Sequence, residues 1–500
     1  MKFLLPLLLF LAAPPLFAQS FLLGIDVDDP PQGILSEEWA EMFLDGEKIG
    51  YTRTLLERRG DVVVTVNESF LGMGRGEARI DTTTVTEIRE RIDGTPLSLS
   101  LVTNENGRVR SQLIRFSGEG AVVTTTAGGR TWDHEVDLEP GFVLSWSFVR
   151  KLAALGEPAP GDSVEARLYS PEITVNAALP VTTLFAGEET IPFRGGERKA
   201  LRVEQRIQVG FLPMDLTVWI DPEGHLLRGT VPVGGMNILL LGSTREQATA
   251  RFEAPELFES TLIPLDRPVP VAAEEVVYRL RTEGPIAGGI PESAAQRVSR
   301  RAEGDYEITV RRGRLDATDG PLEVDGDRYL APSPLVDYED PAIRAIVESV
   351  DWEDLSRPDR LRALVNLADE AIETKSLDLG FATASETVAL SEGDCTEHAL
   401  LLAALARATG FPARGASGLA AFADGNGEPV MGYHMWTQVW DGEEWIDLDA
   451  AFGEAETSPV RILLSTSDLS DNGFADEVLA VAQMVGRTEV EIVEATSPAP

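Results

Sequence analysis

Cysteine and histidine are scarce in this chain of 500 residues. It holds one cysteine, Cys395, and its four histidines are His134, His225, His398 and His434. A single cysteine excludes a disulfide framework within the chain. One thiol and scattered imidazoles also cannot build a zinc site at a familiar spacing. We therefore expect no disulfide and no structural zinc.

Motifs that hold nucleotides or calcium are missing as well. Residues 72–76 form a Gly-x-Gly-x-Gly run, but without the strand-then-helix context that a dinucleotide site needs, so we interpret it as a turn or bulge. Acidic segments at 26–29, 316–327 and 424–428 leave calcium open, although none follows the EF-hand pattern. We predict that the protein uses no cofactor.

Long apolar runs are confined to the N-terminus. Residues 3–17 are apolar, follow Lys2 and precede Ala18-Gln19-Ser20, which is typical of a secretory signal peptide. The run is short for a transmembrane helix, and no later segment is apolar enough to span a bilayer. We predict a signal peptide at 1–18 and a mature protein that is periplasmic or secreted, without stable insertion into a membrane.

Positive charge is the third shortage. The chain has 43 Lys and Arg against 82 Asp and Glu, a net charge of −39. Such a chain repels nucleic acid and anionic lipid, so neither is expected as a partner. Its hydrophobic fraction of 43% is ordinary for a globular protein, and its length argues for several domains.

Strand signals dominate the first half. Asp45-Gly46 and Asn106-Gly107 are hairpin dipeptides, each lying between two runs rich in Thr, Val and Leu. We predict a linker at 19–36, then an antiparallel β domain at 37–255 built as a curved sheet or half-barrel. A small β domain follows at 256–335.

Helix signals first occur near residue 340. Pro341 suits the first turn of a helix through Val350, and further helices are predicted at 358–375 and 383–390. Together with the segments that follow, these make 336–500 an α+β domain. The fold class we expect is therefore α+β and multidomain, with antiparallel β domains before a C-terminal mixed domain.

Cys395 opens the central helix of that last domain, which ends at Gly410. Unpaired N–H groups and the helix dipole at this end favour the thiolate, the nucleophilic form. The alternative is a small buried hydrophobic residue, which a free cysteine often is.

Two further residues complete a catalytic set. A thiol nucleophile needs a base, and the base needs an acid to hold its tautomer. If Trp440 pairs with Trp445 across the turn at 441–444, then His434 and Asp449 share one face of a hairpin as diagonal neighbours. A shift by one residue would place them on opposite faces.

Alternatives remain for both roles. His398 lies three residues after Cys395 on the same side of the helix and is a second candidate base. Asp447 shares a strand face with Asp449 and is a second candidate acid. Trp436 is expected in the core or the cleft wall, where it would shield the His–Asp pair from water.

Four blocks of this region resemble the transglutaminase-like superfamily, thiol enzymes with a papain-like core. The blocks lie at 393–399, 407–414, 433–439 and 445–450. The resemblance covers about a quarter of the chain and implies Cys395 as nucleophile, His434 as base and Asp449 as the orienting carboxylate. It also implies an oxyanion held partly by the backbone N–H of Cys395. The family often has Pro-Thr after this Asp, where the present chain has Ala450-Ala451.

The resemblance implies an acyl-enzyme on a protein or peptide amide, resolved by water in hydrolases or by an amine in cross-linking acyl transferases. We favour hydrolysis. The alternative from another class is an envelope binding or scaffold protein with an idle triad. A protein or peptide substrate is the expected partner, and the oligomeric state is not readable from the sequence.

Overall fold

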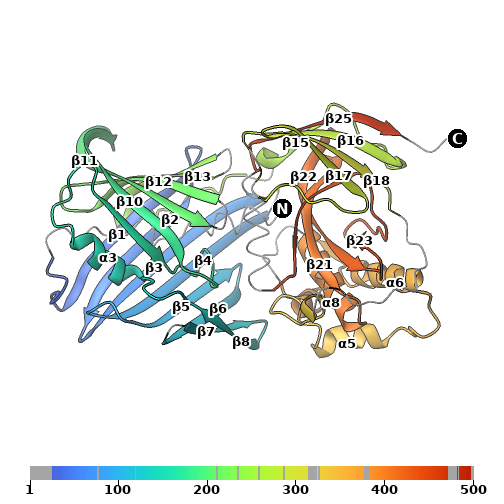
Figure 1. The fold of residues 1–500 in the computed structure, drawn as a ribbon, viewed down its shortest axis with the longest axis horizontal. Coiled ribbons are helices and arrows are strands. Elements are labelled where there is room, and N and C mark those ends of the chain that lie inside the picture. The colour runs from blue at the N-terminus through green and yellow to red at the C-terminus, as the bar shows by residue number, and fades with distance from the viewer. Residues whose placement is uncertain are drawn as a thin grey trace. The chain divides into compact units, whose positions relative to one another are not determined.

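This computed structural model describes residues 25–75, 78–118, 120–209, 212–233, 236–256, 259–284, 286, 288–313, 324, 327–376, 382–470, 481 and 484–496. The predicted signal peptide at 1–18 and the acidic segment at 316–323 lie outside these residues. The chain divides into two compact units, one consisting mainly of residues up to 255 and the other mainly of 256–500 (Figure 1). The predicted boundary between 335 and 336 does not separate the two units and stays a prediction.

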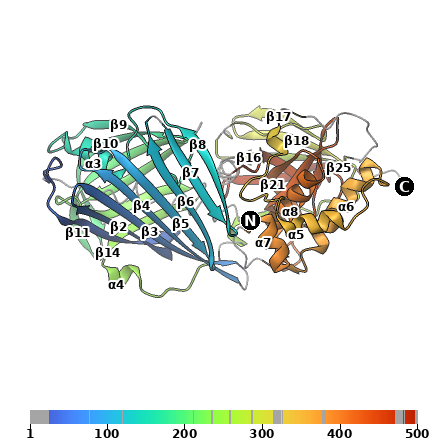
Figure 2. The ribbon, with the colours of Figure 1, turned by 90° about the horizontal axis from the view of Figure 1, so that it is seen from below.

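The first unit is one antiparallel sheet of 14 strands, in the order β8-β7-β6-β5-β4-β3-β2-β1-β14-β13-β12-β11-β10-β9. Figures 1 and 2 show the sheet curling around one of its faces. Its strands are β1 (Gly33–Leu44), β2 (Glu47–Arg59), β3 (Val62–Arg75), β4 (Ala78–Arg91), β5 (Pro96–Glu105), β6 (Arg108–Ser117), β7 (Gly120–Ala127), β8 (Arg130–Asp137), β9 (Ser163–Leu168), β10 (Leu179–Phe193), β11 (Gly196–Val209), β12 (Leu212–Ile220), β13 (Leu226–Val233) and β14 (Met236–Ser243).

Hairpin turns set the register of this sheet. Asp45 and Gly46 both have positive φ, 48° and 90°, and Asn106 and Gly107 repeat the pattern at 48° and 89°. These angles match the two-residue turn whose twist suits a hairpin, which confirms both predicted turns. The predicted linker at 19–36 was too long, because β1 already pairs with β2 from Gly33 onward.

A short helix packs against the buried face of the sheet. In α3 (Ser145–Ala153), Trp146 and Val149 contact Leu56 and Val63 in an apolar cluster. The Glu90 carboxylate accepts the N–H groups of Trp146 at 2.6 Å and Ser147 at 2.9 Å, so it caps the first turn of α3. Burial raises the pKa of Glu90 to about 7, against the effect of these hydrogen bonds. Among the described residues of this unit, a second, one-turn helix is α4 (Arg245–Ala248).

In the second unit, the described residues form two main sheets and the helices α5 to α8. One sheet has the order β15-β22-β21-β24, with β23 paired to β22; the other has the order β17-β18-β16-β25; and β19 and β20 form a short parallel pair. The strands are β15 (Ile263–Pro264), β16 (Glu275–Thr282), β17 (Gln296–Ala302), β18 (Asp305–Arg311), β19 (Thr374–Lys375), β20 (Glu392–Gly393), β21 (Ala413–Ala423), β22 (Pro429–Trp440), β23 (Trp445–Leu448), β24 (Arg461–Ser467) and β25 (Thr488–Thr496).

Four helices of this unit with described bounds precede β21. They are α5 (Pro341–Glu348), α6 (Arg357–Glu370), α7 (Ala384–Leu390) and α8 (Cys395–Ala408), with one-turn 3₁₀ helices at Glu259–Thr261 and Asp327–Tyr329. The first two end short of the predicted limits, at Glu348 and Glu370. Antiparallel β-sheet is thus the main structure of the protein, and the predicted α+β character holds only roughly.

One strand joins the far end of the chain to the small β region. β25 pairs antiparallel with β16, with Glu275 opposite Thr496 and Thr282 opposite Thr488. The sequence predicts a separate small β domain at 256–335, whereas its sheet includes β25 from the end of the last predicted domain. This pairing is non-local, and the turn signals used for prediction are local.

The central helix α8 is buried along nearly its whole length, from Thr396 to Arg407. It packs on β22, and the Thr437 hydroxyl donates to the Ala399 carbonyl at 2.8 Å. This contact fixes the start of α8 beside the strand that carries His434, so the fold brings the predicted nucleophile and base together.

Candidate active site

Cys395 is the first residue of α8 and is partly exposed. Asp394 caps the helix by accepting the Thr396 N–H at 2.8 Å, while Glu397 accepts the Asp394 N–H at 3.0 Å. A Cβ on Gly393 would lie 2.4 Å from the Glu397 Cβ, so only glycine fits there. The capping box therefore holds the thiol rigidly at the N-terminal end of the helix.

His434 and Asp449 meet as the turn length predicted. Trp440 pairs with Trp445 and Thr437 with Leu448, which confirms the register. His434 Nε2 lies 2.7 Å from Asp449 Oδ2, and both side chains are buried. With Nε2 engaged by the carboxylate, Nδ1 is the ring nitrogen left for Cys395, whose side chain is hydrogen-bonded to His434. The three predicted residues thus form one hydrogen-bonded chain.

Charge pairing sets the protonation of this chain. Burial lowers the pKa of His434, but the charge and hydrogen bond of Asp449 outweigh it and raise the pKa to about 9. Burial raises the pKa of Asp449, yet the charges of His434 and Arg461 lower it to about 2. Burial also raises the pKa of the Cys395 thiol, and the hydrogen bond and charge of His434 lower it. The arrangement therefore favours an imidazolium ion beside a thiolate.

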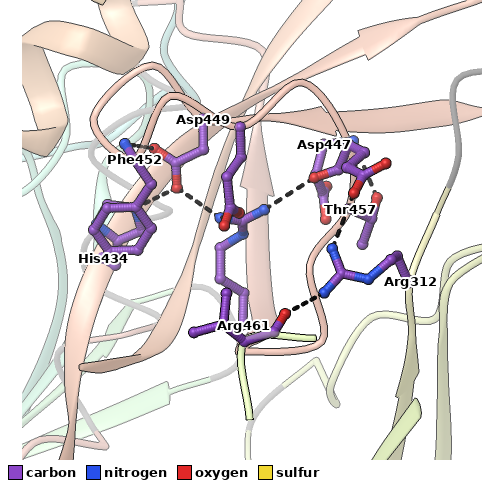
Figure 3. Close-up of polar contacts among 10 residues, drawn as sticks. Arg312, His434, Asp447, Asp449, Phe452, Thr457 and Arg461 are labelled. Atoms are coloured by element: carbon purple, nitrogen blue, oxygen red, sulfur yellow. Dashed lines mark hydrogen bonds and ion pairs between the residues drawn. The ribbon is translucent and has the colours of Figure 1, made fainter. Parts of the chain in front are cut away.

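Arg461 is a part of the site that the sequence did not reveal. It opens β24, is 1% exposed, and its Nη1 lies 2.9 Å from Asp449 Oδ2 and 2.6 Å from Glu454 Oε2. Figure 3 shows Asp449 between Arg461 and His434. The carboxylate of Asp449 is thus held from two sides by cations.

A tight turn carries both Asp449 and Phe452, whose ring stacks on His434. Asp449 and Glu454 exchange backbone hydrogen bonds of 2.7 and 2.8 Å, and Asp449 Oδ1 accepts the Phe452 N–H at 3.3 Å. This turn places the Phe452 ring parallel to the His434 ring, with centroids 4.6 Å apart (Figure 3). Sequence reasoning missed Phe452 because its position depends on the conformation of this turn.

Trp436 is a second aromatic side chain that stacks on the base. It is 1% exposed and stacks on His434 at a centroid distance of 6.0 Å. The Arg461 guanidinium also lies 5.8 Å from the Trp436 ring. These contacts agree with the prediction that Trp436 shields the His–Asp pair. Two aromatic side chains, Trp436 and Phe452, thus stack on the His434 ring.

The alternative base and acid have other partners. His398 Nδ1 lies 2.6 Å from the Asp394 carbonyl, and burial lowers the pKa of His398. Asp447 accepts the Gln438 side-chain amide at 2.7 Å. His398 therefore packs within its own helix turn, and Asp447 orients an amide on the neighbouring strand.

In two of the acidic segments considered for calcium, a carboxylate accepts hydrogen bonds from backbone N–H groups of the same segment. Asp424 Oδ1 accepts the N–H groups of Asn426 and Glu428, and Asp26 Oδ1 accepts that of Asp28. In the described part of the chain, no group of three or more His, Cys, Asp or Glu side chains is arranged to hold a metal ion.

This arrangement can perform nucleophilic chemistry on a carbonyl. Cys395 supplies a thiolate, His434 can give its proton to a leaving group, and Asp449 holds the imidazole in one tautomer. None of the helices in the described ranges is long and apolar enough to cross a membrane.

Comparison with known proteins supports the family resemblance. Residues 345–450 match the family model of the transglutaminase-like superfamily. No curated protein matches the chain.

Solved structures show remote similarity only. A β-barrel-like protein of the domain of unknown function DUF1849 from Brucella abortus is 12% identical, at a TM-score of 0.34, over 42% of this chain and 95% of that chain. A protein from Cytophaga hutchinsonii, provisionally assigned as a cysteine protease, is 15% identical, at a TM-score of 0.29, over 45% of this chain and 89% of that chain. The match to the family model covers the stretch that contains Cys395, His434 and Asp449, so this C-terminal region is a transglutaminase-like domain.

Proposed function

We propose that the protein is an exported cysteine enzyme that cleaves a protein or peptide amide through a thioester, with Cys395, His434 and Asp449 as its catalytic residues. The observation that carries the proposal is the chain of hydrogen bonds from the buried Asp449 and His434 to the partly exposed Cys395. Such a chain produces the ionised thiol and the proton donor that amide cleavage requires.

The reaction proceeds in two halves. In the first, the Cys395 sulfur bonds to the carbonyl carbon, the oxyanion is held partly by the Cys395 N–H at the helix start, and the C–N bond breaks as the His434 imidazolium protonates the departing amine. In the second, neutral His434 takes a proton from water, the hydroxyl bonds to the carbonyl carbon, and the thiol leaves. Asp449 keeps its charge throughout and stabilises the imidazolium.

Two alternatives remain proposals. A cross-linking acyl transferase would use the same first half, with a lysine amine in place of water in the second. A binding or scaffold protein of the envelope would leave the triad idle. The hydrogen bond of His434 with Cys395 and the His434 pKa of about 9 support activity, because both favour the ionised thiol.

The test is the pH profile of iodoacetamide alkylation, which is unambiguous because the chain has one cysteine. The wild type should be alkylated rapidly well below pH 8, since the imidazolium persists up to the His434 pKa of about 9. His434→Ala should show an ordinary thiol profile, with its midpoint near about 8.5. Slow alkylation of the wild type with that same ordinary profile would contradict an activated thiol and would favour the scaffold alternative.

The reaction class needs a second measurement. With a peptide library and a labelled primary amine, hydrolysis predicts free carboxyl products and no amine incorporation. Incorporation of the amine that disappears in Cys395→Ala would instead identify the acyl transferase.

A further inference from the structure

Arg461 and His434 share one oxygen atom of the catalytic acid. Asp449 Oδ2 lies 2.7 Å from His434 Nε2 and 2.9 Å from Arg461 Nη1, whereas Oδ1 accepts the backbone N–H of Phe452 at 3.3 Å (Figure 3). The guanidinium is always charged, and the imidazole is charged when it is protonated. Because two cations then face one oxygen, each weakens the hold of the carboxylate on the other.

Small residues on β21 let the guanidinium reach that oxygen. Arg461 pairs with Ala420 of β21, and His434 of β22 pairs with Gly418, two residues earlier on β21. Paired residues of an antiparallel sheet project to the same face, as do residues two apart on a strand. A Cβ on Gly418 would lie 1.9 Å from the Ile462 carbonyl oxygen, so only glycine fits there. At these two positions, the strand between the guanidinium and the imidazole therefore carries nothing larger than a methyl group.

A second carboxylate, that of Glu454, contacts the same nitrogen of Arg461. Glu454 Oε2 lies 2.6 Å from Nη1, and the Glu454 side chain is 27% exposed, whereas that of Arg461 is 1% exposed. The guanidinium is thus divided between the buried Asp449 and an acid that reaches solvent. Neutralising Glu454 would leave more of the positive charge for Asp449, and replacing Arg461 would leave none.

Other charged groups near this cluster are engaged elsewhere. Their contacts are those of Asp394 with the Thr396 N–H, Lys375 with Asp369 and the Ala451 carbonyl, Asp447 with the Gln438 amide, and Glu456 with Arg312. Cys395 differs, because its hydrogen bond and charge raise the His434 pKa. The groups that act most directly on the His434 proton are thus Cys395, Asp449 and, through Asp449, Arg461.

Acylation removes the influence of Cys395. Once its sulfur is bonded to the acyl group, the negative charge is gone, and the imidazole has given its proton to the departing amine. Water attack then requires that His434 stay neutral, because it must take a proton from water. Asp449 alone would favour the return of a proton from solvent, and the charge of Arg461 on the same oxygen opposes that return.

We infer that Arg461 is a positioning residue that keeps His434 neutral in the acyl-enzyme, so that the second half of the reaction can proceed. This role rests on the proposed thioester mechanism, and it gives Arg461 no contact with the substrate. A merely structural role predicts the opposite effect on His434. Without Arg461, the Asp449 carboxylate would then be held less firmly, and His434 would lose its proton more readily.

The experiment uses the full chain and p-nitrophenyl acetate, which transfers its acetyl group to the Cys395 thiolate and releases p-nitrophenolate. The acetyl-enzyme is separated from the reagent, and the loss of its acetyl group is followed by intact mass at a series of pH values. The rate should rise with pH to a plateau as His434 becomes neutral. In Arg461→Met the midpoint should move to higher pH, so that hydrolysis below the wild-type midpoint slows at least about tenfold, while the plateau rate stays within about twofold.

Matched variants separate charge from structure. Glu454→Gln removes the competing carboxylate, so the midpoint should move to lower pH and hydrolysis below the wild-type midpoint should become several-fold faster. Glu456→Gln removes an equal charge two residues away, where the partner is Arg312, and it should leave the profile unchanged. Arg461→Lys keeps the charge and should keep the midpoint close to that of the wild type. If Arg461→Met does not fold, Glu454→Gln and Arg461→Lys decide the question.

Two results would overturn this role. One is a midpoint that moves to lower pH in Arg461→Met, or a rate that falls equally at every pH, because either means that Arg461 only orients the carboxylate. The other is an unchanged profile in Glu454→Gln. Failure of the proposed function would look different, since the wild type would then form no acetyl-enzyme or would lose its acetyl group no faster than His434→Ala.

Discussion

Two buried carboxyl groups, one in each unit, have pKa values that are shifted in opposite directions. Asp449 is flanked by the cations His434 and Arg461, and their charges lower its pKa to about 2 despite burial. Glu90 is equally buried, but it meets the backbone amides of α3 rather than a cation, and burial raises its pKa to about 7. Burial alone therefore does not decide the charge of a carboxylate; the charge of its partners does.

The surroundings of these two carboxyl groups differ in the same way. Around His434 the charged groups are paired and enclosed by rings, which suits a site that must hold one geometry during a reaction. In the interior of the first unit, the Glu90 carboxylate meets backbone N–H groups of α3 and no cation. One unit thus compensates a buried carboxylate with cations, and the other does so with backbone hydrogen bonds.

The largest expected effect comes from removing the cation. Arg461→Met leaves the buried Asp449 without one of its two cationic partners and the partly exposed Glu454 without its ion pair, and it should lower the free energy of unfolding by about 3–5 kcal/mol. Urea denaturation measures this loss. Arg461→Lys, which keeps the charge, is the control and should lose less. If Arg461→Met is as stable as the wild type, then Asp449 does not need the cation, and the proposed difference from Glu90 is wrong.

The next effect concerns reactivity. Asp449→Asn removes the negative charge that contributes most to raising the His434 pKa. The imidazolium should therefore no longer persist above neutral pH. The rate of Cys395 alkylation at pH 6.5 should fall on the order of 100-fold or more, by analogy with loss of the acid in other triads. Asp447→Asn, on the same strand, is the matched control. Equal rates in wild type and Asp449→Asn would remove Asp449 from the proposed machinery.

The smallest effect tests the other carboxylate. The folded-state pKa of Glu90 lies above the unfolded value, so folding binds a proton between about pH 4.5 and 7 and stability falls as pH rises through that window. The fall contributed by Glu90 should be on the order of 1–3 kcal/mol and should vanish in Glu90→Gln. Thermal unfolding at pH 5 and pH 7.5 measures it. Identical pH slopes in the two proteins would show that Glu90 does not titrate as its burial requires.

Local signals explain what the sequence predicted. The dipeptides Asp45-Gly46 and Asn106-Gly107 force hairpins, and the turn at 441–444 determines which residues of β22 and β23 face each other. That single register was enough to place His434 beside Asp449. The capping box at Cys395 is likewise encoded within a few residues.

Non-local contacts explain what was missed. Arg461 reaches Asp449 because β24 pairs with β21, which no turn signal specifies. β25 joins β16 across some 200 residues of chain, so the sheet membership of the small β region could not be read locally. The burial of Thr65, Thr82 and Thr84 was missed because alternation of Thr with other residues predicts a strand but does not indicate that the Thr face is buried.

The parallel stack of Phe452 on His434 has a spectroscopic consequence. A proton held over the face of an aromatic ring experiences that ring's induced magnetic field, and its resonance shifts upfield. With ring centroids 4.6 Å apart and only four histidines in the chain, the imidazole signals of His434 should stand apart from the other three. The base of the proposed reaction would thereby be its own probe, readable by NMR without any label and without a known substrate.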